Sequence, residues 1–505
     1  MRIIYVPLDE RPCNSKYPAL NVAGIDDCEL VMPDPGILGK KKTAGDVEAL
    51  ARWLRAETPR AQSLILSLES LVYGGLLPSR IHSLGAAECG ARLSLIPELK
   101  RANPSIEVSL FGLIMRTPSY SSAEEEPDYC AQYGAKIHRR AWLADKGKRR
   151  GLDESETAEL ARCEADIPAS VIADYEGRRK VNSAVLHAAL EYVQRGGVDY
   201  FLIPIDDSAP YGYSAIDQRA VRLQRRELGL QRIAPMHPGA DEAGATLVAR
   251  TLVRASGKSP TVELLYSSTS GGARIPRYED RPLEESLVSQ IDAAGMRLAR
   301  HDERSDIILA VNAPGEPMLE AWDQDSADPT YDSLRHLGVF SDEIARRVSD
   351  GALVALADVA YSNGADKELV GLLDRSGALD GLASYAGWNT AGNTIGTALA
   401  QAASELVAPN EKRREKLLTY RLLEDCCYQS CVRQELSLAA PAPVSERERA
   451  EHFRSGGQIA QRTAERMREV FRVEVSRSLH GAERGLVGVS FPWNRYFEID
   501  IDYSL

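Results

Sequence analysis

The sequence predicts an α/β protein built on a (β/α)8-like barrel, with a helical insertion and a C-terminal helical region. Short apolar runs alternate with segments of helical periodicity over residues 1–410, which indicates a parallel sheet. Polar residues follow nearly every apolar run, as one shared site at the carboxyl ends of barrel strands would require. The charge-rich residues 411–505 have mainly helical character.

About ten strands are expected, two more than a barrel of this type needs, so two of them would be hairpin or edge strands. Two doubly wound parallel-sheet domains would use every strand and are the alternative architecture. The expected strands are Ile3–Leu8, Glu29–Met32, Ser63–Leu68, Ile106–Met115, Tyr200–Ile205, Ile233–Met236, Val262–Ser267, Ile307–Asn312, Leu353–Ala357 and Leu382–Ala386.

The sequence predicts two domains, an α/β core and a mainly helical C-terminal region. Residues 1–410 form the α/β catalytic core, in which the polar segment of about 119–180 is a helical insertion covering the strand ends as a lid. Residues 411–505 form a C-terminal region that docks on the core or contributes to oligomer contacts, with a strand-like run at Val487–Phe491. Helices are also expected at Ala44–Arg55, Arg178–Arg195 and Ala215–Leu228.

Composition narrows the class of protein. Of 505 residues, 44% are hydrophobic and 27% charged, which is typical of a soluble globular protein, and the net charge of −12 argues against nucleic acid or an anionic membrane as the main partner. The chain enters a strand at once, without a signal peptide or a membrane-spanning run. We therefore expect a cytoplasmic protein with free thiols. A homo-oligomer is compatible with these features.

The strongest candidate for a catalytic site is the stretch YFLIPIDDSAPYG, residues 200–212. Its buried apolar run stops at Asp206 and Asp207. Consecutive strand residues face opposite ways, so both acids reach one site only if the strand ends between them. One acid could then orient a substrate while the other acts as a general acid whose pKa is raised by burial and by its neighbour. The structural alternative is that Asp207 caps a turn and Asp206 pairs with an arginine.

Other strand ends supply candidate substrate-binding residues. Trp388 offers an apolar platform and Asn389 an amide, a combination that suits sugar binding. Asp241 and Glu242 open a helix, where capping is the ordinary role of acids. The full predicted set is Asp9, Arg11, Tyr73, Arg116, Tyr211, Asp241, Glu242, Asp358, Asn363, Trp388 and Asn389, with Arg80 as a further polar residue at a strand end.

The chain carries no nucleotide, zinc or serine-hydrolase motif, so we expect no cofactor and assign no metal ligand. The function we infer is hydrolysis of a small sugar-derived substrate by paired carboxylates, as a glycoside hydrolase. One alternative is a hydrolase that uses a divalent metal bound by Asp206, Asp207, His237, Asp241 and Asp358. The other is a sugar-binding sensor without catalytic activity.

Eight motifs resemble the bacterial proteins grouped as domain of unknown function family 4127, over the chain up to about residue 435. They are PLDERPCN, SLVYGGLLPSR, IMRTP, IDDSAPYG, PGADE, YEDRPLEES, ADVAYSNGAD and YAGWNTAGNTIGTALA. That family resemblance implies no activity. The strand ending in adjacent aspartates is also similar to N-acetylhexosaminidases of the O-GlcNAcase type. This second resemblance implies that Asp206 orients a 2-acetamido group and that Asp207 is the general acid, with Tyr385, Trp388 and Asn389 holding the sugar.

Overall fold

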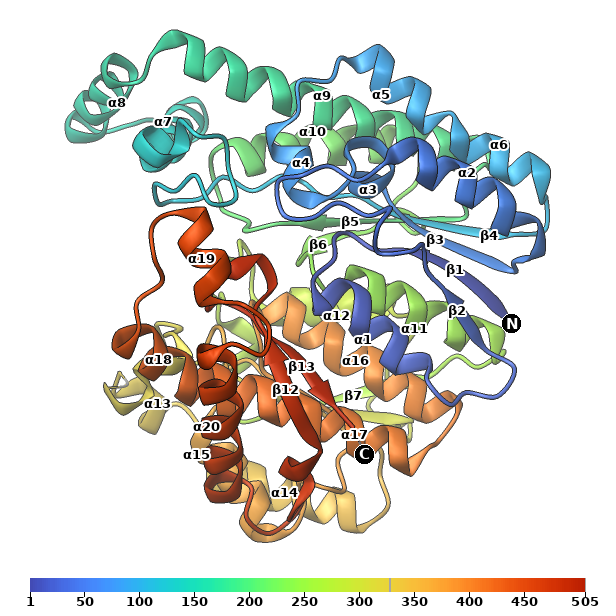
Figure 1. The fold of residues 1–505 in the computed structure, drawn as a ribbon, viewed down its shortest axis with the longest axis vertical. Helices are drawn as coiled ribbons and strands as arrows, with labels where there is room; N and C mark the ends of the chain where they lie inside the picture. The colour runs from blue at the N-terminus through green and yellow to red at the C-terminus, as the bar shows by residue number, and fades with distance from the viewer. Residues whose placement is uncertain (327, 505) are drawn as a thin grey trace. The chain divides into compact units, whose positions relative to one another are not determined.

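The computed structural model describes residues 1–326 and 328–504 and divides into two compact units (Figure 1). Unit 1 comprises Met1–Glu10, Asp27–Gly244 and Tyr278–Asp280. Unit 2 comprises Arg11–Asp26, Ala245–Arg277 and Arg281–Leu505. The residues after 411 therefore belong to the same unit as the second sheet.

Unit 1 is built on a parallel sheet that has six strands among the described residues, in the order β2–β1–β3–β4–β5–β6. Ile4 of β1 lies opposite Leu64 of β3, which in turn lies opposite Val108 of β4. Every residue of β3 and β5 is buried. The strands are β1 Arg2–Val6, β2 Glu29–Val31, β3 Ser63–Ser67, β4 Glu107–Phe111, β5 Tyr200–Ile205 and β6 Met236–Pro238.

The helices of unit 1 gather on one face of this sheet (Figure 1). Leu50 and Leu54 of α2 and Leu186 and Leu190 of α9 pack into one apolar core with the inward residues of the strands. The helices are α2 Val47–Glu57, α3 Leu68–Tyr73, α4 Leu76–Ile81, α5 Ala86–Leu93, α6 Leu95–Ala102, α7 Cys130–Arg150, α8 Glu154–Asp166, α9 Ala169–Gln194 and α10 Tyr213–Glu227.

The long connection between β4 and β5 contains α7, α8 and α9. Helix α8 begins with a capping box, in which Asp153 Oδ1 accepts from the amide of Glu156 at 2.8 Å and Glu156 Oε2 accepts from the amide of Asp153 at 3.2 Å. A small apolar cluster around Ile137, Ile167 and Tyr175 holds these helices together. The insertion thus has a core of its own.

Unit 2 contains a second parallel sheet, in the order β11–β10–β9–β7–β8. Alternate residues of its strands enter two different cores. Ile308 and Leu356 pack with α14 and α15, whereas Leu309 and Ala357 pack with α12 and α16. Helices therefore cover both faces of this sheet. The strands are β7 Thr261–Tyr266, β8 Arg297–Leu298, β9 Ile307–Asn312, β10 Val354–Asp358 and β11 Ser384–Ala386.

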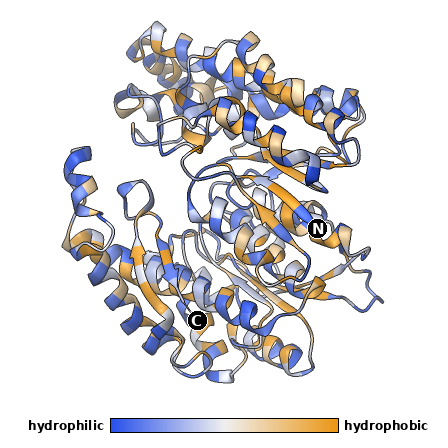
Figure 2. Ribbon diagram, turned by 45° about the vertical axis from the view of Figure 1, so that its right-hand side comes forward, coloured by the Kyte–Doolittle hydropathy of each residue, from blue (hydrophilic) through white to orange (hydrophobic). Residues whose placement is uncertain are grey.

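The rest of unit 2 is mainly helical, with the antiparallel hairpin β12 Leu486–Ser490 and β13 Asp500–Tyr503 near the end of the chain. Figure 2 shows hydrophobic residues concentrated on the strands and hydrophilic ones spread over the helices. The helices are α1 Pro12–Val22, α11 Ala243–Ala255, α12 Leu283–Ala293, α13 Thr330–Ser333, α14 Leu337–Ser349, α15 Lys367–Ser376, α16 Ala391–Val407, α17 Glu411–Arg421, the π-helix η4 Leu422–Val432, α18 Arg433–Ala439, α19 Glu446–His452 and α20 Gln458–Glu474.

The predicted (β/α)8-like barrel was wrong, because the parallel strands of the described residues form two open sheets and no closed barrel. Of the two architectures considered, the one with two parallel sheets is confirmed. In each sheet the first strand is internal: β1 lies between β2 and β3, and β7 lies between β8 and β9. In each sheet the third strand therefore lies on the opposite side of the first strand from the second. In a barrel each strand lies beside the one that precedes it in the sequence.

None of the described helices combines the length and the apolar character that a membrane crossing requires. Each of the eight cysteines is free.

Candidate functional site

The two adjacent aspartates lie where β5 ends. β5 stops at Ile205, and the amide of Asp206 donates a hydrogen bond to the carbonyl oxygen of Ile114 at 3.2 Å. The backbone of Asp207 adopts a left-handed conformation, with φ of 43°. Such a conformation costs a non-glycine residue roughly 1–3 kcal/mol. This turn lets the two carboxyl groups face two neighbouring arginines, which a continuing strand would prevent.

Each aspartate contacts one of these arginines. Arg80 Nη2 lies 2.7 Å from Asp206 Oδ2, and Arg116 Nη1 lies 3.4 Å from Asp207 Oδ2. Arg80 belongs to α4, which follows β3, and Arg116 follows β4. The side chain of Arg80 is only 3% exposed, so its charge needs carboxylate partners at short range.

Two consecutive glutamates from the β4–β5 connection bridge both arginines. Glu125 Oε2 lies 3.0 Å from Arg80 Nη1 and 3.0 Å from Arg116 Nη2. Glu126 Oε1 lies 3.4 Å from Arg80 Nη1 and 3.0 Å from Arg116 Nε. We call this group the carboxylate–arginine cluster; its members are Arg80, Arg116, Glu125, Glu126, Asp206 and Asp207. Its carboxyl groups outnumber its guanidinium groups, which favours retention of a proton at one of the acids.

Asp207 is the acid of this cluster best placed to keep a proton. Burial, followed by the negative charge of Asp206, raises the pKa of Asp207 to about 7, against the opposing effect of Arg116. Its side chain nevertheless retains 25% of its exposure. Asp207 can therefore be protonated near neutral pH and still be reached by a ligand.

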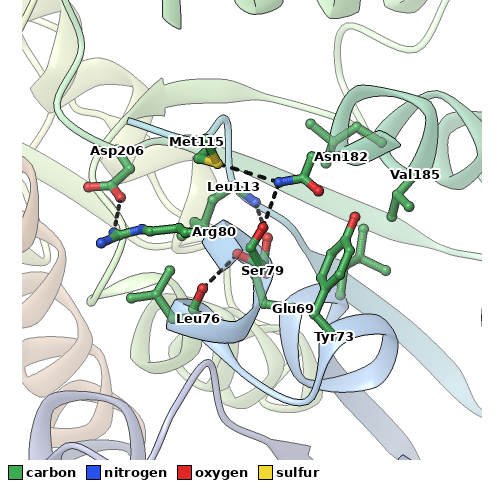
Figure 3. A pocket seen from close by; sticks show the side chains of 12 residues that line it. Glu69, Tyr73, Leu76, Ser79, Arg80, Leu113, Met115, Asn182, Val185 and Asp206 are labelled. Atoms are coloured by element: carbon green, nitrogen blue, oxygen red, sulfur yellow. Dashed lines mark hydrogen bonds and ion pairs between the residues drawn. The ribbon is translucent and has the colours of Figure 1, made fainter. Parts of the chain in front are cut away.

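A third acid, Glu69, lies in the first turn of α3 directly after β3. Its Oε1 accepts from the amide of Leu113 at 2.8 Å and its Oε2 accepts from Ser67 Oγ at 3.2 Å. Burial raises the pKa of Glu69 to about 7. Glu69 lines a small cavity together with Arg80 and Asp206 (Figure 3). The site therefore extends from the end of β5 to the end of β3.

The candidate site lies at the carboxyl edge of the sheet of unit 1. In open parallel sheets, ligands bind at the carboxyl edge where the strand order reverses, which here is between β1 and β3. Asp9 follows β1 and is buried, and Glu69 follows β3. Ser70 Oγ donates to the carbonyl oxygen of Pro7 at 2.5 Å and so ties the two loops together. Asp9 thus lies at the switch point of its sheet.

The other residues predicted in unit 1 lie around this edge in different environments. Tyr73 is buried, and its ring stacks on His82 with centroids 4.6 Å apart. Tyr211 packs against Trp142 of the insertion at 5.1 Å. Asp241 and Glu242 follow β6 and are both buried, and Glu242 Oε2 accepts from the amide of Ala240 at 2.8 Å. That last bond stabilises the turn between β6 and α11, and the capping role considered for these acids stays a prediction.

In unit 2, Asp358 ends β10 and is fully buried in a network of hydrogen bonds. It accepts from Asn312 Nδ2 at 2.9 Å, from Tyr385 Oη at 3.0 Å and from the amide of Asp366 at 2.7 Å. Burial and the charge of Asp366 raise the pKa of Asp358 to about 7. Asp366 in turn binds Arg335 at 2.5 Å. With both oxygens engaged, Asp358 orders the loop that follows β10.

Asn363, Trp388 and Asn389 lie in the loops after β10 and β11. Asn363 and Asn389 are left-handed, with φ of 59° and 69°, and the amide of Asn363 donates to the carbonyl oxygen of Asn389 at 3.0 Å. Asn363 Nδ2 also donates to Glu320 at 2.7 Å. The Trp388 ring packs against Phe497 at 5.9 Å. The two loops are thus joined and conformationally constrained.

The π-helix η4 supports both loops of unit 2 through Asp425. The carboxylate of Asp425 accepts from the amide of Gly387 at 2.7 Å, and its carbonyl oxygen accepts from the amide of Ala365 at 3.0 Å. Arg11, the last predicted residue, stacks on Trp493 at 4.5 Å and lies 3.9 Å from Glu498. The C-terminal segment therefore contributes to the surroundings of the predicted residues in unit 2.

The structure brings Asp206, Asp207 and Arg116 together. Asp206 pairs with an arginine and Asp207 lies in a turn, features that the structural alternative also predicts, so the catalytic role of the two acids stays a prediction. The predicted residues belong to two different sheets. Those of unit 1 are Asp9, Tyr73, Arg116, Asp206, Asp207, Tyr211, Asp241 and Glu242, and those of unit 2 are Arg11, Asp358, Asn363, Trp388 and Asn389. The predicted set lacked Glu69, Glu125 and Glu126, and Arg80 was noted only as a polar residue at a strand end. The acidic run at residues 124–126 was the available signal.

Among the described residues, no group of three or more histidine, cysteine, aspartate or glutamate side chains has an arrangement that could hold a metal ion.

Comparison with known proteins identifies a family. A family model described as "Protein of unknown function (DUF4127)" matches residues 3–502. No curated protein and no solved structure matches the chain. The match confirms the family resemblance seen in the motifs and extends it beyond residue 435 through the C-terminal region. The similarity to N-acetylhexosaminidases remains a prediction.

Proposed function

The chain belongs to the DUF4127 family of proteins of unknown function, and we propose that it is a hydrolase of a small sugar-derived substrate, acting as a glycoside hydrolase. One observation carries the proposal: two adjacent carboxyl groups at a strand end have different surroundings. Burial raises the pKa of Asp207 to about 7, while Asp206 is ion-paired with Arg80 at 2.7 Å. Carboxyl pairs whose environments differ in this way divide acid and binding roles between them.

Asp207 is the general acid in this proposal. In the first step Asp207 donates its proton to the glycosidic oxygen while the bond between that oxygen and the anomeric carbon breaks and the oxygen of a 2-acetamido group of the substrate, oriented by Asp206, bonds to the anomeric carbon. In the second step the Asp207 carboxylate accepts a proton from the water whose oxygen bonds to the anomeric carbon, and the bond to the acetamido oxygen breaks. The proton count is thereby restored after each turnover, and no oxidant or reductant is needed.

Asp206 holds the substrate. Its Oδ2 is fixed by Arg80, and its Oδ1 accepts no hydrogen bond from the described residues. That oxygen can accept a hydrogen bond from a hydroxyl or amide group of the substrate. Arg80 is buried and is held by Glu125 and Glu126, so Asp206 is positioned before substrate arrives. Little conformational entropy of the Asp206 side chain is then lost when substrate binds.

An exposed aromatic residue next to the cluster supports a sugar substrate. The side chain of Tyr120 is 52% exposed, and the charges of Arg116 and Asp207 act on its hydroxyl group. An exposed ring beside paired acids can stack on the C–H face of a sugar. Its loop is held against α7 at Gly134, where an added Cβ would come within 2.8 Å of the Tyr120 carbonyl oxygen.

The first test is hydrolysis itself. The purified protein is offered a panel of chromogenic α- and β-glycosides, including N-acetylhexosaminides and phosphorylated sugars, with and without EDTA. We expect release of the chromophore from at least one glycoside, at a rate that the chelator leaves unchanged. Loss of activity with EDTA would support the metal-dependent alternative. Binding of sugars without turnover of any glycoside would support a sensor.

The second test concerns the role of Tyr120. Replacing Tyr120 with alanine should weaken substrate binding roughly 2- to 10-fold, since a stacked aromatic contact contributes about 0.5–1.5 kcal/mol. The effect should appear in KM, with kcat little changed, because the ring binds ground state and transition state alike. Leu223→Ala, at a 47% exposed side chain of α10, is the control. An unchanged KM would remove Tyr120 from the substrate site.

A further inference from the structure

A groove of about 460 Å³ lies between helix α20 and the hairpin of β12 and β13 in unit 2. The helix packs beside β12, as Figure 1 shows. It contributes one face to the groove, from Ala460 through Ala464 to Arg468, which is about 12 Å long at the usual helical rise. That length has room for about four residues of an extended chain. The groove can therefore hold a short extended peptide.

The edge of β12 that faces away from β13 has unpaired backbone groups. On β13, the amide of Ile501 donates to Tyr420 Oη at 3.4 Å and its carbonyl oxygen accepts from Lys16, so both groups point away from β12. Val489 lies opposite Ile501, and two opposed residues of an antiparallel pair point their backbone groups the same way, either toward or away from each other. The amide and carbonyl of Val489 therefore point away from β13, and neither has a hydrogen-bond partner among the described residues. Val489 also lines the groove.

Two further features show that this edge is open. Val487 is the extra residue of a bulge in the pairing with β13, and it is 58% exposed. At Gly488, which also lines the groove, an added Cβ would meet no atom within 4 Å apart from those of its chain neighbours. β12 carries no charged residue. An exposed, uncharged strand edge is a template for pairing with another chain.

Acidic side chains outnumber basic ones in the lining of the groove. Glu465 of α20 and Asp502 of β13 are exposed, and neither makes an ion pair within the part of the chain that the structure describes. The third acid, Asp500, pairs with Lys16 at 2.8 Å. Arg468 donates to a backbone carbonyl of β12 at 2.7 Å. Glu465 and Asp502 are thus available to cationic groups of a ligand.

We propose that this groove binds an extended segment of a partner protein that carries lysine or arginine, with the segment lying along β12 and bonding to its free edge. The segment donates to the Val489 carbonyl oxygen and accepts from the Val489 amide, as in strand addition, and its cationic side chains contact Glu465 and Asp502. A second copy of this chain is a poorer occupant, because pairing of two β12 edges would bring the same acids of both copies together. The site belongs to unit 2 and does not depend on the proposed hydrolase activity.

Binding of defined peptides to the full chain tests the proposal. The probe is a fluorescent, acetylated and amidated peptide of alternating lysine and valine, and the comparison peptide has glutamate in place of lysine. We expect saturable binding of the lysine peptide that weakens as salt is raised, and roughly tenfold or weaker binding of the glutamate peptide. Hydrogen exchange at the Val489 amide should slow in the complex, because that amide then donates to the added strand. Attraction of charge alone would not protect this amide.

Gly488→Leu is the sharpest variant. The free protein has open space for the new side chain, so stability should be retained, but the side chain fills the place of the peptide and affinity should fall roughly tenfold or more. Gly90→Leu is the matched control, at an exposed position of α5 where an added Cβ also meets no such atom within 4 Å; it should bind as the wild type does. Asp502→Asn should weaken binding roughly 2- to 5-fold, the usual range for an exposed ion pair.

Several outcomes would overturn the proposal. They are failure of the lysine peptide to bind, equal binding of both peptides, and unchanged affinity in Gly488→Leu. Unchanged exchange at the Val489 amide in the bound state would also overturn it, and would reduce the groove to a site for cations. Concentration-dependent association of the chain that Gly488→Leu abolishes would assign the groove to a second copy instead.

Discussion

Asp207→Asn should reduce the rate of glycoside hydrolysis roughly 100- to 10,000-fold while substrate still binds, since that is the usual contribution of a positioned general acid. Asparagine has nearly the same shape as aspartic acid but no proton to give to the leaving group. The contact with Arg116 is long, at 3.4 Å, so the substitution should disturb the cluster little. Initial rates and calorimetric binding of the same glycoside would separate the two effects.

The pH dependence of the wild-type rate follows from the same residue. Burial and the charge of Asp206 raise the pKa of Asp207 to about 7. A general acid works only while protonated, so kcat/KM should be retained below pH 7 and decline as the pH rises through about 7. Asp128→Asn, at a fully exposed side chain of the connection between β4 and β5, should keep the wild-type profile. A variant Asp207→Asn with the wild-type rate and profile would show that another group supplies the proton.

The positions of the strands could be predicted from the sequence, but their order in space could not. The run at residues 200–205 was recognised as a buried strand because every residue in it is apolar, and β5 spans the same residues. A barrel and two open sheets share the alternation of strands and helices. In a barrel β3 would pair with β2, whereas in the open sheet it pairs with β1. Which pairing forms depends on how helices pack, and these helices are distant from both strands in the sequence.

The same limit applies to the site. The run of polar residues after β5 and β4 pointed to Asp206, Asp207 and Arg116, because carboxyl ends of neighbouring parallel strands share one edge. Glu125 was missed as a partner because it lies 45 residues from Arg80 in the sequence, in the segment between β4 and α7. Glu69 was missed because its environment, not its neighbours in sequence, raises its pKa.

In unit 2, Arg421→Met should destabilise the protein by about 3–5 kcal/mol at neutral pH, the usual cost of removing one partner from a buried ion pair. Arg421 is 1% exposed, lies 3.1 Å from Asp425 through Nε and 3.2 Å from Glu424, and stacks on the ring of Tyr17 at 4.6 Å. Without the guanidinium group, two adjacent carboxyl groups of the π-helix stay buried with no cation among the partners described for them.

The loss should depend on pH in a defined direction. Burial raises the pKa of Glu424 to about 7 and also raises that of Asp425. For an acid whose pKa is higher in the folded state than in the unfolded state, stability falls as the pH rises between the two values. Removing Arg421 raises the folded-state values further, so the difference in urea midpoint from wild type should be larger at pH 8 than at pH 5. The control is Arg466→Met. Arg466 lies on α20 with its side chain 42% exposed, so this substitution should change the midpoint little at either pH.

Hydrogen exchange provides a second measurement. Because Asp425 holds the loops after β10 and β11 through Gly387 and Ala365, exchange at these two amides should accelerate in Arg421→Met. A midpoint difference that is small, or equal at both pH values, would show that the two carboxyl groups are neutral in the native protein and that Arg421 contributes mainly through packing on Tyr17.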